Sequence, residues 1–445
     1  MLKDRYGNAL STQSREAADK FDAAAELIRL YRGDPIGALD AALAADPDFT
    51  MAWAVRAGLL AQQTDKAYFE EAARSLRAAE SHAARGNERE RAHIAAARDW
   101  VEGRYDDGTA AYARIAQEHP RDHLALQFAH LGCFFVGRQF ELRDWPLQAL
   151  RAWSPGEDGR GCILGMAAFG LEECGDYARA DALGREAVEA DPRDGWAVHA
   201  VAHVNEMRGD RGAGISWLRD SAAAWAPESG FAYHNWWHLA LLYLDQNDHA
   251  EALKLYDEKV RPQASDILLE CVDASALLWR LHLEGADVGA RWANVADTWA
   301  RTTEDGIYAF NDLHAVMAFI GAGRRAELAE VLAAMRRAAY GEGDNALMTR
   351  AVGLPLAEGF AAFGEGRYAE AVEKIAAVRG IAQRFGGSHA QRDVLTLTAL
   401  HAAMRGGMKE TAEAFAAERL AHKPASPWAL KLSKQAGAIE ARAAA

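Results

Sequence analysis

The chain has 445 residues, half of them hydrophobic, so it can bury a large core. It carries 50 Lys and Arg against 64 Asp and Glu, which gives a net charge of −14. This balance argues against nucleic-acid partners and against docking to anionic membranes, because both need a basic face. With only 11 Pro and abundant Ala, the composition favours an all-α chain.

The sequence shows no sign of export or membrane insertion. The first residues contain no basic stretch followed by an apolar one, and no apolar run approaches the ~20 residues that a membrane span needs. The four cysteines are scattered without a CxxC pair, so neither a disulfide framework nor a thiolate zinc site is expected. We therefore expect a cytoplasmic protein.

A helical-hairpin repeat is visible in the segment from Gly161 to Arg193. Gly175 and Asp176 form a turn between two helices, Ala180 stands where the helices make close contact, and Pro192 follows the second helix. A tetratricopeptide unit places a small turn residue, a close-contact Ala and a terminal Pro at these positions.

The same inter-helix turn recurs at spacings of 34 or 38 residues. A period near 34 indicates helical hairpins, and no segment sustains the period of two that a strand needs. The turn residues are Gly103, Gly137, Gly175, Gly209 and the degenerate Asn247, with a further copy at Gly366.

We predict an all-α fold, a tetratricopeptide-like helical-hairpin solenoid that forms a superhelix with a concave groove. The prediction is one domain over residues 1–445, of roughly eleven or twelve hairpins. The clearest repeats lie within 89–259 and 352–383, and 260–351 is predicted to hold irregular helical repeats. The register predicts burial between helices for Trp53, Ala180, Ala187, Val198, Val201, Ala202, Leu239, Ala240 and Ala252.

Two HxxxH pairs fall on helices that the register assigns to the groove. They are His199 with His203 and His234 with His238, and residues four apart share one helical face. The four imidazoles are predicted to hold a divalent metal, zinc or iron. Glu206, one turn beyond His203, is a candidate catalytic base, although no Glu follows either first His as in HExxH.

Other interpretations of these residues stay open. The histidines and tryptophans would also suit a metal-free pocket, with Trp237 as an aromatic wall, or a structural hydrogen-bond network. Asp312 and His314, near the start of a later helix, are candidate catalytic residues. Ser388 suits an N-cap, and Arg392 with Asp393 suits either ligand binding or an ion pair.

The chain resembles the tetratricopeptide repeat protein 38 family over nearly its whole length. The resemblance rests on four motifs: Asp194 to Met207, His234 to Leu241, Phe310 to Ala318 and Gly386 to Val394. Carried over by position, the residues that match the family pattern are His199, His203, Glu206, His234, His238, Asn311, Asp312, His314, Arg392 and Asp393. The resemblance implies the repeat fold and adds Asn311 to the expected ligand-binding residues.

These observations predict a His-rich concave pocket that binds a small molecule and a metal. Hydrolysis is the first reaction class to consider, with Glu206 or Asp312 moving the proton and Arg392 holding a substrate carboxylate. The alternative is a protein- or peptide-binding scaffold without catalysis, and a homo-oligomer is left open. Five histidines and two carboxylates on separate segments favour the small-molecule pocket.

Overall fold

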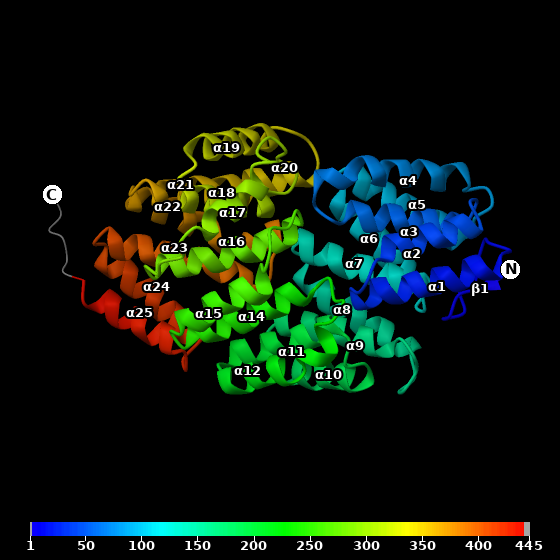
Figure 1. Ribbon diagram of the computed structural model, residues 1–445, viewed down its shortest axis with the longest axis horizontal. Coiled ribbons are helices and arrows are strands. Elements are labelled where there is room, and N and C mark those ends of the chain that lie inside the picture. Colours follow the sequence, from blue (N-terminus) through cyan, green and yellow to red (C-terminus); the bar gives the residue numbers. More distant parts are fainter. Residues whose placement is uncertain (1, 440–445) are drawn as a thin grey trace. The chain divides into compact units, whose positions relative to one another are not determined.

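The computed structural model describes residues 2–439, and their regular secondary structure is helical apart from one short hairpin and an isolated β-bridge. Strands β1 (Leu2–Lys3) and β2 (Ala9–Leu10) pair antiparallel, with Leu2 opposite Leu10. Consecutive helices pack against each other as hairpins, for example α1 with α2 and α9 with α10 (Figure 1). The predicted fold class, all-α with tetratricopeptide-like hairpins, is confirmed.

The chain divides into two compact units. Unit 1 comprises Met1–Val201 and Ser221–Ala232, and unit 2 comprises Ala202–Asp220 and Tyr233–Ala445. The division falls inside helix α11 (Gly195–Arg208) rather than at a linker. The single solenoid over residues 1–445 stays a prediction, and the expected fraying of residues 441–445 lies outside the described residues.

Unit 1 is a succession of short helices, most of them about three or four turns long. Beyond the strands and the first half of α11, its elements are α1 (Arg15–Leu30), α2 (Pro35–Ala45), α3 (Thr50–Ala61), η1 (Lys66–Tyr68), α4 (Phe69–Ser81), α5 (Glu88–Val101), α6 (Tyr105–Glu118), α7 (His123–Val136), α8 (Gln139–Ala149), η2 (Leu150–Ala152), α9 (Arg160–Glu173), α10 (Tyr177–Ala190) and α13 (Ala222–Trp225).

Unit 2 contains the second half of α11 and nearly all of α14 (Ala232–Asp245). Two π-helical turns, η3 (Tyr256–Val260) and η4 (Thr349–Gly353), lie at the two ends of the region 260–351 that was predicted to hold irregular repeats. The other elements are α12 (Arg211–Asp220), α15 (His249–Leu255), α16 (Leu268–Leu283), α17 (Arg291–Trp299), α18 (Ala309–Ala322), α19 (Arg325–Ala339), α20 (Asp344–Met348), α21 (Leu354–Gly364), α22 (Tyr368–Arg379), η5 (Ala382–Phe385), α23 (His389–Arg405), α24 (Lys409–His422) and α25 (Pro427–Gly437).

Each predicted inter-helix turn lies between two helices and has a left-handed backbone. The φ angles at the six turn residues range from 61° at Asn247 to 82° at Gly175. Glycine adopts this conformation without the Cβ clash that other residues meet, which explains why five of the six residues are Gly.

The predicted core residues are buried with one exception. This exception is Trp53, which is only partly buried. Its indole Nε1 donates to the carbonyl oxygen of Pro47 at 2.9 Å. The other eight residues that the register placed between helices are at most 1% exposed. The register inferred from the turns is therefore correct at these positions.

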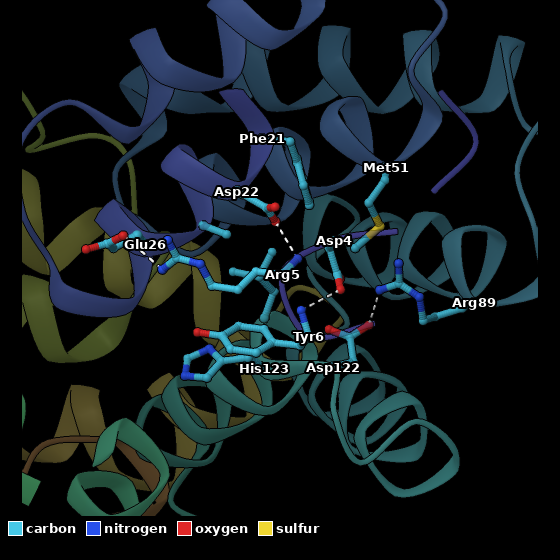
Figure 2. Close-up of a pocket in the computed structure, with 12 residues that line it drawn as sticks. Asp4, Arg5, Tyr6, Phe21, Asp22, Glu26, Met51, Arg89, Asp122 and His123 are labelled. Atoms are coloured by element: carbon cyan, nitrogen blue, oxygen red, sulfur yellow. Dashed lines mark hydrogen bonds and ion pairs between the residues drawn. The ribbon is translucent and has the colours of Figure 1, made fainter. Parts of the chain in front are cut away.

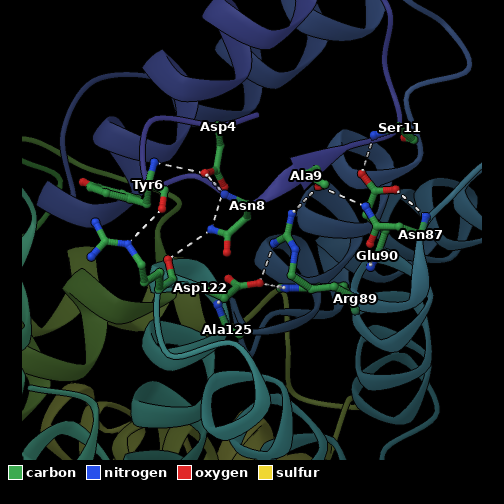
Figure 3. A network of polar contacts seen from close by, with 12 residues as sticks. Asp4, Tyr6, Asn8, Ala9, Ser11, Asn87, Arg89, Glu90, Asp122 and Ala125 are labelled. Carbon is green, nitrogen blue, oxygen red and sulfur yellow. Dashed lines mark hydrogen bonds and ion pairs between the residues drawn. The ribbon is translucent and has the colours of Figure 1, made fainter. Parts of the chain in front are cut away.

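The N-terminal hairpin of unit 1 is tied to α5 and α7 (Figure 3). Arg89 and Asn87 both donate to the carbonyl oxygen of Ala9, and the Asn8 amide donates to the carbonyl oxygen of Arg121 at 3.1 Å.

Among residues 2–439, no helix combines the length and apolarity needed to cross a membrane.

Candidate functional site: a buried histidine cluster in unit 2

The α11 and α14 segments of unit 2 carry the predicted cluster. His203 and Glu206 are three residues apart on α11, and His234 and His238 are four apart on α14, so each pair shares a helical face. His203 and His238 are each 1% exposed and His234 is 7% exposed. The helical periodicity therefore brings three imidazoles into a buried position.

The three rings converge on one point. Nε2 of His238 lies 3.2 Å from Nε2 of His234, and the ring centres of His203 and His238 are 4.4 Å apart. Ligand nitrogens of His203, His234 and His238 all lie within 4.8 Å of one another. This spacing lies within reach of a single bound ion.

A carboxylate lies beside the outer nitrogen of each α14 histidine. Nδ1 of His234 lies 2.7 Å from Oδ2 of Asp273 on α16, and Nδ1 of His238 lies 3.4 Å from Oε2 of Glu206. Lys423, just after α24, donates to Oε1 of Glu206 at 2.6 Å. These contacts link five side chains in series: Asp273, His234, His238, Glu206 and Lys423.

The charges of these linked side chains depend on one another. Burial, followed by the influence of His203, lowers the pKa of His238 well below its usual value. Burial alone would raise the pKa of Glu206, but Lys423 and His238 hold it well below the usual value. The arrangement therefore favours a neutral His238 ring beside an ionised Glu206.

His199, the fourth predicted ligand, lies one turn before His203 on α11 and belongs to unit 1. Its ring packs against Phe169, Trp196 and Phe231, with ring centres 5.1 to 5.2 Å away. Its role as a metal ligand stays a prediction.

Trp237 and Arg280 flank the cluster within unit 2. Trp237 stacks on the ring of His234 with ring centres 5.3 Å apart, and the guanidinium of Arg280 lies 5.4 Å from the ring centre of Trp237. Arg280 is fully buried on α16 and donates to the carbonyl oxygens of Ala276 and Ala390. Burial lowers the pKa of Arg280 to about 10, so it remains charged near neutral pH.

The predicted residues Asn311, Asp312 and His314 are buried on α18, which packs against α16. Nδ1 of His314 donates to the carbonyl oxygen of Phe310 at 2.7 Å. Burial, and then the charge of Asp305, raises the pKa of Asp312 to about 8, which favours its protonated form. Their catalytic and ligand-binding roles stay predictions.

Arg392 and Asp393 contribute to a different part of unit 2, a cavity between α23 and α24. Asp393 pairs with Arg419, and Arg392 donates to the carbonyl oxygen of Gly387. Ser388 caps α23 in a capping box with Gln391, as its position after two glycines suggested.

Four charged residues of this region escaped the functional assignments made from sequence. These residues are Asp273, Arg280, Arg419 and Lys423, and no role was predicted for any of them. The available signal was spacing, since Asp273 and Arg280 are seven apart and Arg419 and Lys423 are four apart, each pair on one face.

Unit 1 also contains a pocket, shown in Figure 2, but its polar groups bind one another. The Asp22 carboxylate accepts from the Arg5 backbone, and Glu26 accepts from the Arg5 guanidinium, both at 3.0 Å. Its volume of about 20 Å³ leaves room for little more than a water molecule. We interpret it as a structural contact.

No family model matches the sequence. Two solved structures of human IFIT1 dimers, one with m7Gppp-AAAA and one with PPP-AAAA, are similar to this chain over 98% of its length and 97% of theirs. The identities are 14% and 12%, and the TM-scores are 0.44 and 0.38.

Proposed function

We propose that unit 2 holds a divalent-metal centre built on His203, His234 and His238, which serves a small-molecule site. The observation that carries the proposal is the pair of Nε2 atoms 3.2 Å apart, backed on their far sides by Asp273 and Glu206. Two ligands at 2.0–2.1 Å from a tetrahedral ion lie roughly 3.3–3.4 Å apart, which is close to this separation.

Counting protons supports a cation between the two rings. Asp273 and Glu206 accept hydrogen bonds, so each favours a proton on the Nδ1 atom that faces it. A neutral imidazole carries one proton, so both Nε2 atoms would then present lone pairs to each other at 3.2 Å. That contact is repulsive unless a cation, or a third proton, lies between the nitrogens.

The partners of the histidines suit this role. A carboxylate on the outer nitrogen fixes the tautomer and raises the basicity of a ligating imidazole. Asp273 lies in this position for His234, with Oδ2 2.7 Å from Nδ1, and Glu206, which accepts from Lys423, lies 3.4 Å from Nδ1 of His238. Imidazole ligands suit zinc and iron, so these are the ions that we propose.

A divalent ion in this position would supply Lewis acidity, and hydrolysis is the reaction class we propose for it. Glu206 would hold the Nδ1 proton of His238, and Asp312, favoured in its protonated form, would serve as a proton donor. Membership in the tetratricopeptide repeat protein 38 family is part of the same proposal.

The burial of the three imidazoles favours this proposal over a peptide-binding scaffold. A peptide lying in a groove needs side chains that it can reach, whereas these rings are at most 7% exposed. A metal ion is small enough to occupy such a position.

The test is metal analysis of the untagged full-length protein, followed by chelation and titration with zinc and cobalt(II). We expect near-stoichiometric zinc or iron in the purified protein, and cobalt absorption bands typical of nitrogen-rich tetrahedral coordination. His238→Ala should lose both signals. His249→Ala, which replaces a partly buried histidine on α15, is the matched control and should keep both.

Metal-free protein that also fails to bind either ion would overturn the proposal. Equal loss in His238→Ala and His249→Ala would point to general destabilisation rather than a ligand role, so helicity and unfolding midpoints are compared in parallel. His234→Ala provides a second removal of a ligand within the same centre.

A further inference from the structure

A second pocket of unit 1 is lined by residues on or next to four helices, α1, α7, α9 and α11. Its volume is about 10 Å³, which is room for one species of about the size of a water molecule. The polar and aromatic side chains that matter for its chemistry all belong to unit 1 and are Arg29, Tyr31, His123, Gln127, Asp194 and Trp196.

The guanidinium group of Arg29, near the end of α1, lacks a full set of hydrogen-bond acceptors. The Arg29 side chain is 6% exposed, and among the described residues its Nε–H group has no hydrogen-bond partner. Its ion pair with Asp158 spans 3.8 Å, which is beyond hydrogen-bond distance. A buried donor in this situation calls for an acceptor that is not part of the chain, such as a water molecule or an ion.

Two further ring nitrogens of this wall are in the same situation. Nε1 of Trp196 and Nε2 of His123 are both buried and have no hydrogen-bond partner within residues 2–439. Guanidinium and indole N–H groups can only donate, and an imidazole can carry its proton on Nε2. The wall therefore offers two obligate donors and a third group that can donate.

The other polar groups of the wall have partners of their own. Oδ1 of Asp194 accepts from the backbone N–H groups of Trp196 and Ala197, both at 3.0 Å, so this carboxylate caps α11. The Gln127 amide donates to the carbonyl oxygen of Ile28 at 3.0 Å, and the Gln127 side chain also interacts with the Tyr31 hydroxyl group. These groups leave the donors of Arg29 and Trp196 unmet.

The backbone at Tyr31 is a second, independent sign of a binding site. Its φ of 53° is left-handed, which is uncommon for a residue other than glycine. In this conformation the Tyr31 ring stacks on Trp196, with ring centres 5.5 Å apart. Backbone strain of this kind is concentrated at positions that clamp ligands.

We propose that this pocket binds a single halide ion, which accepts from Arg29 Nε, Trp196 Nε1 and His123 Nε2. A halide only accepts, so it can meet all three donors, whereas a water molecule brings two protons that need acceptors of their own. Hydrogen bonds from a guanidinium group to an anion are also stronger than those to a neutral acceptor. This inference concerns unit 1 alone, goes beyond the metal centre of unit 2 and needs no metal.

The test combines unfolding and diffraction of the full-length protein. Thermal unfolding is followed while potassium gluconate, whose anion is too large for the pocket, is replaced by chloride or bromide at constant ionic strength. We expect the unfolding midpoint to rise and then saturate, as for a ligand that binds only the folded chain. Crystals grown in bromide should show an anomalous peak within hydrogen-bond distance of Arg29 Nε and Trp196 Nε1. A water molecule at this position, or a midpoint that does not respond to halide, would overturn the proposal.

Trp196→Phe keeps an aromatic ring but removes the indole N–H, and it should weaken the apparent chloride affinity about tenfold or more. Trp53→Phe is the matched control, because the Trp53 indole donates to Pro47 outside this pocket, and it should leave the affinity unchanged. Arg29→Lys keeps the charge but removes Nε–H, and its expected loss of affinity keeps the test informative if Trp196→Phe fails to fold. Equal chloride responses of the Trp196 and Trp53 variants would contradict the proposed site.

Discussion

Units 1 and 2 each bury a histidine beside an aspartate, yet the two clusters differ in what else contacts these two side chains. In unit 1, Oδ2 of Asp122 accepts from Arg89 at 2.5 Å and Oδ1 accepts from the backbone of Ala125 (Figure 3). The same Oδ2 lies 2.8 Å from Nε2 of His93. In unit 2, Asp273 and Glu206 each favour a proton on the histidine beside it, and two ring nitrogens are left facing each other.

We propose that the first cluster is structural and that the second is a binding site. Burial alone would raise the pKa of Asp122, but His93 and Arg89 bring it well below its usual value, so the carboxylate is ionised and fully compensated. Under our proposal, a cation bound between the two Nε2 atoms would complete the contacts of the histidines in unit 2. The two clusters therefore differ in what lies beside the histidine: an arginine–aspartate pair in unit 1 and a second imidazole in unit 2.

The largest expected effect would come from removing the carboxylate that joins Arg89 and His93 in unit 1. Asp122→Ala leaves Arg89 and His93 buried without their carboxylate and removes the N-cap of α7, so it should destabilise unit 1 by about 3–5 kcal/mol. Hydrogen exchange of α5 and α7 amides measures this effect. Asp158→Ala, which removes a largely exposed partner of Arg29, should cost less than about 1 kcal/mol. Similar effects of both variants would show that the buried Asp122 carboxylate does not stabilise unit 1 more than an exposed one does.

The corresponding change in unit 2 should affect metal binding rather than folding. Asp273→Asn keeps an oxygen that accepts from Nδ1 of His234 but removes the charge, so zinc affinity should fall about 10–100-fold. The free energy of unfolding of the metal-free protein should change by less than about 1 kcal/mol. Competition with a fluorescent zinc chelator measures the affinity. A variant that unfolds but retains normal zinc affinity would place Asp273 with Asp122 as a structural residue.

The response to acid provides a third contrast. His130 on α7 of unit 1 is buried, and burial lowers its pKa to about 3. The unfolded chain then binds more protons than the folded one below pH ~6.5, so stability falls as the pH drops from about 6.5 towards 3. His130→Phe should flatten this dependence, as measured by urea unfolding at several pH values. An unchanged slope would show that other groups dominate acid unfolding.

Much of the fold follows from local chemistry and could be predicted. Turn residues such as Gly175 are recognisable because a left-handed φ strongly favours glycine, and this requirement acts within a few residues. The HxxxH pairs are recognisable for a similar reason, because a helix repeats every 3.6 residues. These local rules place His203, His234 and His238 correctly on their helices.

The partners of the histidines could not be predicted in the same way. Asp273 lies 39 residues from His234, and Lys423 lies 217 residues from Glu206. Their contacts depend on how whole helices pack, which the periodicity of a single helix does not encode. The division into two units escaped prediction for a related reason, since it passes through α11, where no Gly- or Pro-rich linker marks a boundary.

The smallest effect that we predict compares the same turn in the two units. Gly175 in unit 1 has φ of 82°, and Asn247 in unit 2 has φ of 61°. A Cβ at Gly175 would meet no atom within 4 Å, so Gly175→Asn adds only the left-handed backbone strain, which asparagine tolerates better than most residues. We expect a loss below about 1 kcal/mol there and a smaller change, of opposite sign, for Asn247→Gly, because glycine relieves strain but also frees the unfolded chain. Urea unfolding of both variants and of the double variant measures the effects. A loss of several kcal/mol at Gly175 would mean that this turn, unlike its counterpart in unit 2, makes contacts that the repeat register does not predict.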